Sequence, residues 1–163
     1  MLSVVREAEK SIGGMMQKDV IILIAEDDDG HAKLIEKNLK REGILNEIIR
    51  FKDGQDTLDY LFQKGKGLRR ENDKALMLLL DIRMPKVDGV EVLRQVKENK
   101  KLKKIPVTMI TTTDDPRVVE NCYALGCSNY VTKPTDYDKF VIAIHQLSLS
   151  LNVAQVPKIN ENS

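Results

Sequence analysis

The stretch Ala75-Leu-Met-Leu-Leu-Leu-Asp81 is an uninterrupted apolar run that ends in a carboxylate. It shows no alternation of apolar and polar side chains, and this predicts a strand that is buried on both faces. Such a strand needs helices on both sides of its sheet, which an open antiparallel sheet does not have. The run therefore favours an α/β protein, with Asp81 at the carboxyl end of one strand.

Four further segments predict strands, at residues 20–25, 47–51, 107–110 and 129–132. The second of these is more polar, so we expect it nearer an edge. Between the strands lie charged segments with apolar residues at helical spacing. Capping signals mark helix starts at Asp28 or Asp29, Asp53, Asp114-Asp115-Pro116, and Thr135 or Asp136. The strict alternation predicts a doubly wound parallel sheet of five strands flanked by five helices.

Length and composition set the outer limits. The chain has 163 residues, 26 basic and 25 acidic side chains and two cysteines, which fits one globular domain without a disulfide framework. A net charge of +1 gives no long-range attraction for nucleic acid, and no apolar run approaches the roughly 18 residues that span a bilayer. We expect a cytoplasmic protein with no nucleic-acid or membrane partner. We divide it into a mobile extension (1–19), a domain (20–150) and a tail (151–163).

Polar residues follow four of the predicted strands, at the edge where ligands bind in α/β sheets. Glu26 and Asp27 follow the first strand, Asp81 the third, Thr111 the fourth and Lys133 the fifth. Two carboxylates about 5 Å apart repel by roughly 3 kcal/mol at a dielectric constant of about 20, so three of them require a cation or a proton. Oxygen ligands of this kind suit Mg²⁺, whereas Zn²⁺ prefers His or Cys.

Magnesium with open coordination positions commonly serves phosphate chemistry. Asp81 could then attack phosphorus as a carboxylate nucleophile, while Lys133 and the Thr111 hydroxyl hold the phosphoryl oxygens. The product of this reaction is an aspartyl phosphate. His31 and His145 each stand alone on a predicted helix, without a second His or Cys at ligand spacing, so we expect no metal or phosphohistidine role for either.

The chain resembles the receiver domains of two-component response regulators. The resemblance rests on Glu26-Asp27, Asp81-Ile-Arg-Met-Pro-Lys-Val-Asp-Gly89, Ile105-Pro-Val leading to Thr111-Thr112, and Tyr130-Val-Thr-Lys-Pro134. The intervals of 30 residues from Asp81 to Thr111 and 22 from Thr111 to Lys133 are also typical of compact receivers. The resemblance covers about residues 20–150 and implies the flavodoxin-like receiver fold. Within the family the chain looks most like the small stand-alone regulators of phytochrome-type histidine kinases.

The resemblance implies a role for each residue of the acidic site. Asp81 accepts a phosphoryl group from a phosphohistidine, carried by a histidine kinase or a histidine phosphotransfer protein. Glu26, Asp27, Asp81 and the backbone carbonyl of Arg83 hold Mg²⁺, and Lys133 contacts the phosphoryl group. Glu26 stands where the family more often has Asp.

The resemblance also implies a switch. Thr111 turns toward the phosphoryl group and Tyr130 fills the vacated space, which changes the face over the fourth helix, the fifth strand and the fifth helix. Arg83 and Thr113 occupy positions that tune autodephosphorylation in this family. The protein is then a signalling domain that catalyses only its own phosphotransfer and slow autodephosphorylation, and not an enzyme with a separate substrate.

Two other functions remain open. A phosphatase of the haloacid dehalogenase type also uses an Asp nucleophile and Mg²⁺ on an α/β fold, but it needs a second acid where this chain has Arg83. A pseudo-receiver that binds a partner without phosphorylation is the other alternative. The intact set of Asp81, Thr111 and Lys133 argues against it.

The C-terminal residues bear on how the protein transmits its state. We expect no output domain, so an unknown downstream target must be reached through a surface. Apolar residues alternate from Leu147 to Val153, which predicts an extended segment lying across a neighbouring subunit. We therefore expect a homodimer built from strand five, helix five and the tail. The alternative is a tail that folds back on its own domain.

Overall fold

The computed structural model describes residues 19–159, and within them one parallel sheet. The strands are β1 (Ile21–Ala25), β2 (Ile48–Phe51), β3 (Leu76–Leu80), β4 (Val107–Thr111) and β5 (Asn129–Thr132). The helices are α2 (Asp29–Arg41), α3 (Gly54–Phe62), α4 (Gly89–Glu98), η1 (Leu102–Lys104, 3-10), α5 (Pro116–Leu125) and α6 (Tyr137–Val153). The predicted five strands and five α-helices are confirmed. The expected N-terminal extension lies, apart from Asp19, outside the described residues.

The strand order is β2-β1-β3-β4-β5, and every neighbouring pair is parallel. The apolar run forms β3 at the centre, with all five residues buried, and the more polar β2 lies at an edge as predicted. From β1 the chain continues to β2, toward one edge of the sheet, and from β3 it continues to β4, toward the other edge. The crevice between the carboxyl ends of β1 and β3 is therefore the topological switch point, where ligands bind in such sheets.

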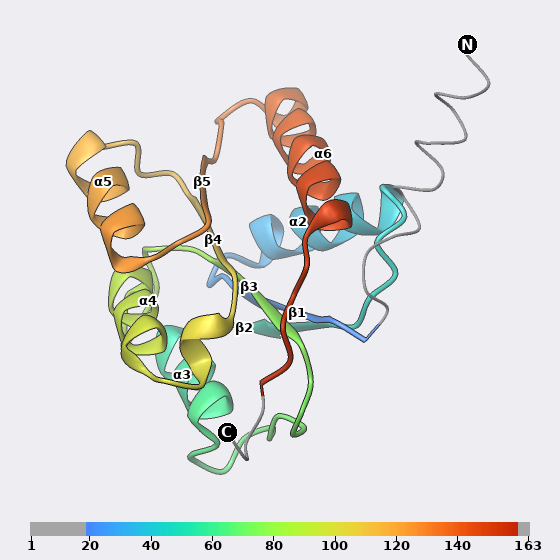
Figure 1. Ribbon diagram of the computed structural model, residues 1–163. Coiled ribbons are helices and arrows are strands. Elements are labelled where there is room, and N and C mark those ends of the chain that lie inside the picture. The colour runs from blue at the N-terminus through green and yellow to red at the C-terminus, as the bar shows by residue number, and fades with distance from the viewer. Residues whose placement is uncertain (1–18, 160–163) are drawn as a thin grey trace.

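Helices cover both faces of the sheet, with α2 and α6 on one side and α3, α4 and α5 on the other (Figure 1). Alternate residues of each strand enter two separate cores. Ile22 and Leu79 belong to the core under α2 and α6, whereas Leu23 and Leu78 belong to the other. Within residues 19–159 no helix is long and apolar enough to cross a membrane.

Aspartates fix the helix starts just beyond the strand ends. The N-caps predicted for four of the helices are confirmed. The side chains of Asp28, Asp53, Asp115 and Asp136 each accept a hydrogen bond from a backbone N–H in the first turn. The start of α4 lies directly against the end of β3, because a Cβ on Gly89 would lie only 2.0 Å from the Asp81 carbonyl oxygen. Only glycine lets α4 begin against the end of β3.

The C-terminal segment corrects one prediction. Residues 147–153, expected to be extended, are the last turns of α6. Beyond the helix the chain returns to its own sheet, where Lys158 forms an antiparallel bridge with Ala75. Val156 and Ile159 are buried there. The described part of the tail therefore follows the alternative left open above and packs at the amino edge of the sheet, away from the acidic crevice.

Candidate functional site

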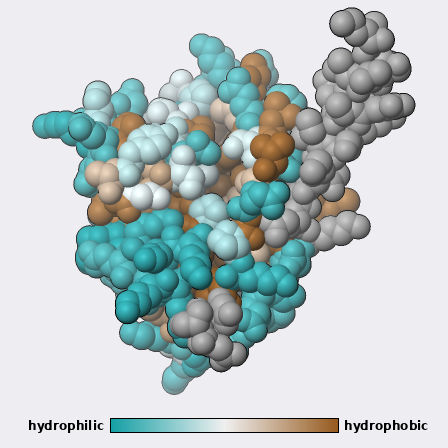
Figure 2. Space-filling model, in the orientation of Figure 1, coloured by the Kyte–Doolittle hydropathy of each residue, from teal (hydrophilic) through white to brown (hydrophobic). Residues whose placement is uncertain are grey.

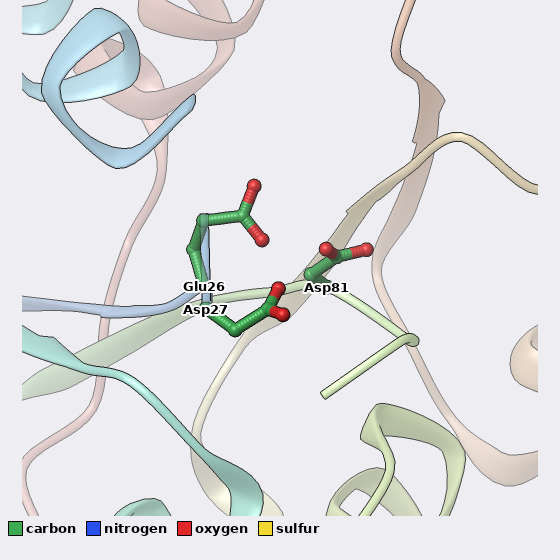
Figure 3. Close-up of side chains that lie close together, drawn as sticks. All are labelled: Glu26, Asp27 and Asp81. Carbon is green, nitrogen blue, oxygen red and sulfur yellow. The ribbon is translucent and has the colours of Figure 1, made fainter. Parts of the chain in front are cut away.

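Three carboxylates meet at the carboxyl edge of the sheet. Glu26 and Asp27 follow β1 and Asp81 follows β3, and the pairing of Ala25 with Leu80 sets these strand ends side by side. One oxygen of each carboxylate lies within 4.8 Å of the others. Figure 3 shows the three groups gathered around a common space. Glu26 and Asp81 are buried and Asp27 is exposed, so the predicted convergence is observed.

Lys133, which follows β5, reaches this cluster. Its backbone N–H donates to the Thr111 carbonyl at 2.7 Å, which fixes the start of the loop. Its Nζ donates to Glu26 Oε1 and, at 3.2 Å, to Asp81 Oδ2. The side chain is almost fully buried. One ammonium group therefore faces three carboxylates, and the site is short of positive charge.

The two buried carboxyl groups differ in their electrostatics. Burial, together with the neighbouring Asp81 carboxylate, raises the pKa of Glu26 to about 8 despite the attraction of Lys133. Burial also works against ionisation of Asp81, but the Glu26 and Thr111 side chains and the charge of Lys133 outweigh it and lower the Asp81 pKa below its usual value. Without a metal, the cluster thus keeps Asp81 ionised and favours a proton on Glu26.

The donor set fits a hard divalent cation. All three donors are carboxylate oxygens, as Mg²⁺ prefers, and among the described residues they are the group with the right spacing for a metal. Glu26 Oε2 is buried and has no hydrogen-bond partner. A buried polar oxygen without a partner is costly, and a cation would satisfy it. Mg²⁺ would also relieve the repulsion among the carboxylates.

The two residues of the expected switch, Thr111 and Tyr130, both hydrogen-bond to Thr113 in the loop after β4. Thr111 is fully buried at the end of that strand, and its Oγ1 accepts a long hydrogen bond of 3.5 Å from the Thr113 N–H. Tyr130 is half-buried on β5, and its hydroxyl donates to the Thr113 carbonyl at 2.6 Å. Burial raises the pKa of Tyr130 to about 12, so the hydroxyl remains a donor. Arg83 lies exposed in the loop between β3 and α4.

Two residues of the site were not predicted from the sequence. Arg50, on β2, donates to the Glu26 carbonyl from Nε at 3.0 Å and from a terminal nitrogen at 2.8 Å, and it also reaches the Asp27 carbonyl at 3.2 Å. His31, expected to take no part, contacts Glu26 and Lys133. The sequence signal that could have pointed to Arg50 was a basic residue within an apolar strand. For His31 the signal was its place in the first helical turn after the acidic pair.

Replacing Glu26 with glutamine is expected to change how metal-free stability depends on pH. The Glu26 pKa is about 8 when folded, against an ordinary 4.5, so between these values the folded state binds more protons than the unfolded state. Wild-type stability therefore contains a term that is fully present below about pH 4.5 and is lost as pH rises toward 8. Glu26→Gln does not titrate, so its melting temperature relative to wild type should rise from about pH 5 to about pH 8.

Thermal melts in EDTA at the two pH values measure this difference, with Glu120→Gln, an exposed carboxylate on α5, as the matched control. A difference between Glu26→Gln and wild type that is the same at both pH values would contradict the raised pKa.

Fold and site together define an α/β domain whose switch-point crevice holds three carboxylates, a buried lysine and a buried threonine. Comparison with known families then places it: residues 22–145 match the model of the response regulator receiver domain, and the chain belongs to this family. It is a receiver domain of two-component signalling, a regulator and not a classical enzyme.

Known relatives agree with this assignment. A receiver domain from Rhodospirillum rubrum is 46% identical, with a TM-score of 0.80 over 86% of this chain and 99% of that one. Response regulator Rcp1 of Synechocystis is 35% identical over 69% of this chain and 76% of its own length. Its Mn²⁺-bound structure is 31% identical, with a TM-score of 0.75 over 84% of this chain and 98% of that one. The structure of the bacteriophytochrome response regulator RtBRR is 38% identical, with a TM-score of 0.66 over 88% of this chain and 85% of that one. The expected likeness to phytochrome-type regulators is confirmed.

Proposed function

We propose that Asp81 takes up a phosphoryl group from the phosphohistidine of a histidine kinase or a histidine phosphotransfer protein. One observation carries the proposal: the Asp81 carboxylate belongs to the three-carboxylate cluster and lies 3.2 Å from Lys133 Nζ. The lowered pKa keeps Asp81 ionised and therefore nucleophilic. Phosphohistidines of such kinases are made with cytoplasmic ATP, so we place the protein in the cytoplasm.

In the transfer, an Asp81 carboxylate oxygen forms a bond to phosphorus while the P–N bond of the phosphohistidine breaks. The electron pair of that bond stays on the departing imidazole nitrogen. Glu26, Asp27, Asp81 and the Arg83 carbonyl would hold Mg²⁺, which when bound neutralises charge on the phosphoryl oxygens. The Mn²⁺-bound form of Rcp1 supports a divalent cation in this family.

Lys133 changes partner during this reaction. In the structure its Nζ is held by Glu26 and Asp81, and both carboxylates acquire a new partner when metal and phosphoryl group arrive. The ammonium then contacts a phosphoryl oxygen, and the Thr111 hydroxyl supplies a second donor. Because both groups are buried, they act where water competes little for their hydrogen bonds.

The site favours this function over the two alternatives. A haloacid dehalogenase-type phosphatase needs a second acid two residues after its nucleophile, and that position holds exposed Arg83. A pseudo-receiver would have no need for the buried Lys133 beside an ionised Asp81.

The switch that we propose passes through Thr113. Its N–H donates to Thr111 and its carbonyl accepts from Tyr130, so a turn of Thr111 toward the phosphoryl group disturbs the anchor of Tyr130. Tyr130 then moves into the vacated space. Arg83 lies in the loop after β3 and Thr113 in the loop after β4. We propose that they set a slow autodephosphorylation by controlling the approach of water.

We propose that the switched surface forms a homodimer along β5 and α6. Strand β5 is an edge strand, and a groove of about 190 Å³ lies between it and α6, lined in part by Tyr130 and Gln146. Ile142, Leu149 and Val153 are more than half exposed on α6, and apolar side chains are visible along that helix in Figure 2. A second copy would bury this stripe. Residues 154–159, which follow α6 and return to the sheet of their own chain, are not part of this proposal.

Charging the stripe is expected to prevent dimerisation. In sedimentation velocity at high micromolar concentration, wild type should contain dimer, and more of it with beryllofluoride, whereas Ile142→Lys with Leu149→Lys should stay monomeric. Leu45→Lys, at a residue that is 85% exposed outside this face, is the matched control. Truncation is unsuitable because Leu151 and Val156 are buried in the domain. A wild-type protein that is monomeric in both states would refute the dimer.

The phosphotransfer itself is tested with a small phosphodonor such as acetyl phosphate. With Mg²⁺, intact-mass spectrometry should show one added phosphoryl group per chain, and with EDTA none. Incorporation that is unaffected by EDTA would contradict the proposed use of the metal.

A further inference from the structure

His31 touches the acidic cluster although it belongs to none of the motifs of the sequence. Its Nδ1 lies 3.1 Å from Glu26 Oε1 and 3.2 Å from Lys133 Nζ, and those two atoms are hydrogen-bonded to each other. A neutral imidazole has either a proton or a lone pair at Nδ1, so it donates to Glu26 or accepts from Lys133. In the first case it restrains Glu26 Oε1 directly, and in the second it restrains the ammonium group that binds that oxygen.

The ring of His31 is itself held in place. Its backbone N–H donates to the capping carboxylate of Asp28 at 2.8 Å, which fixes the first turn of α2. Its ring stacks on Phe140 of α6, with a centroid distance of 6.3 Å and an interplanar angle of 29°. Phe140 is buried in the core between α2 and α6. Although the His31 side chain is 44% exposed, it is therefore a supported group and not a freely moving one.

The two oxygens of Glu26 have different surroundings. Oε1 is contacted by Lys133 and His31, whereas Oε2 is buried with no hydrogen-bond partner. Anchoring one oxygen of a carboxylate fixes the direction of the other. Glu26 is thus held in place before a cation arrives, and its unpartnered oxygen belongs to one of the three carboxylates whose spacing suits a metal ion.

We propose that His31 is a positioning residue of the metal site, which holds Glu26 Oε1 together with Lys133 and so presents Oε2 as a preorganised Mg²⁺ ligand. The inference rests on the proposed function only in that the crevice binds Mg²⁺. Partners that orient metal ligands in this way typically change metal affinity by about 10–100-fold when they are removed.

The test is Mg²⁺ binding by the full-length protein, measured by isothermal titration calorimetry and by the Mg²⁺-induced rise in melting temperature. His31→Ala removes ring and hydrogen bond, and His31→Phe keeps a ring to stack on Phe140 but has no nitrogen. Both should weaken Mg²⁺ binding about tenfold. His31→Asn can place its amide near the position of Nδ1 and should bind within about threefold of wild type. His145→Ala is the matched control, because His145 also contacts a glutamate and is about as exposed, but lies outside the crevice.

The outcomes separate this inference from the function on which it rests. Wild type that binds no Mg²⁺ overturns both. Wild type that binds Mg²⁺, with all His31 variants binding equally well, overturns the role of His31 and leaves the phosphoacceptor site intact. An equal loss in His31→Asn, or in His145→Ala, also overturns it, because neither loss would trace to a hydrogen bond at Nδ1.

Discussion

Replacing Asp81 with asparagine is expected to abolish phosphorylation. The amide retains the shape of the side chain but lacks the ionised oxygen that attacks phosphorus, so incorporation from acetyl phosphate should fall by about a thousandfold or more, to background. The fold should survive, because one negative charge fewer relieves repulsion among the three carboxylates. Intact-mass spectrometry of both proteins after the same exposure measures the effect.

Asp114→Asn is the matched control, since Asp114 is an exposed carboxylate at the same edge of the sheet, in the loop after β4. It should take up one phosphoryl group like wild type. Equal incorporation in Asp81→Asn and wild type would show that another residue is the phosphoacceptor.

Replacing Lys133 with alanine is expected to separate phosphoryl binding from the switch and to destabilise the metal-free protein. The ammonium is the partner of two buried carboxyl groups, and losing one member of a buried ion pair costs roughly 3 kcal/mol, less what protonation of Glu26 recovers. Mg²⁺ should restore much of this stability, because it supplies the missing positive charge. With Mg²⁺ and beryllofluoride, the NMR shifts around Thr111 and Tyr130 that wild type shows should be absent.

Lys97→Ala provides the comparison for this variant. Lys97 is a partly buried lysine that donates to the backbone carbonyls of Lys103 and Ile105, at the amino edge of the sheet. It should lose some stability and keep the beryllofluoride shifts. Wild-type shifts at Thr111 and Tyr130 in Lys133→Ala would refute its part in the switch.

The fold could be predicted because its determinants are local. An all-apolar run such as residues 75–80 requires cover on both faces, and an aspartate such as Asp53 or Asp115 caps the helix that follows it. The end of α6 was mispredicted because Leu147, Leu149, Leu151 and Val153 alternate with polar residues as in a strand. On the helix, Leu147 and Leu151 form one buried row and Leu149 and Val153 an exposed one, each at a spacing of four.

The predicted part of the site follows from topology. Parallel strands bring their carboxyl ends to one edge, so Glu26, Asp81 and Lys133 had to converge once the strands were known. Arg50 and His31 could not be found in this way, because their roles depend on where side chains point. Arg50 reaches the acidic pair only because β2 lies beside β1, and His31 only because the first turn of α2 faces Lys133 across the crevice.

Chemical mapping of the phosphoryl group tests the central claim most directly. Borohydride reduces an acyl phosphate on aspartate to homoserine, so the acceptor can be read from a peptide digest of the protein after exposure to phosphodonor and Mg²⁺. We expect homoserine at position 81 and at no other aspartate, including Asp27. A glutamyl phosphate would instead be reduced to 2-amino-5-hydroxypentanoate, and we expect none of this product at any glutamate, including Glu26. Homoserine elsewhere with unmodified Asp81, or a phosphoryl group that withstands base and borohydride, would contradict the assignment.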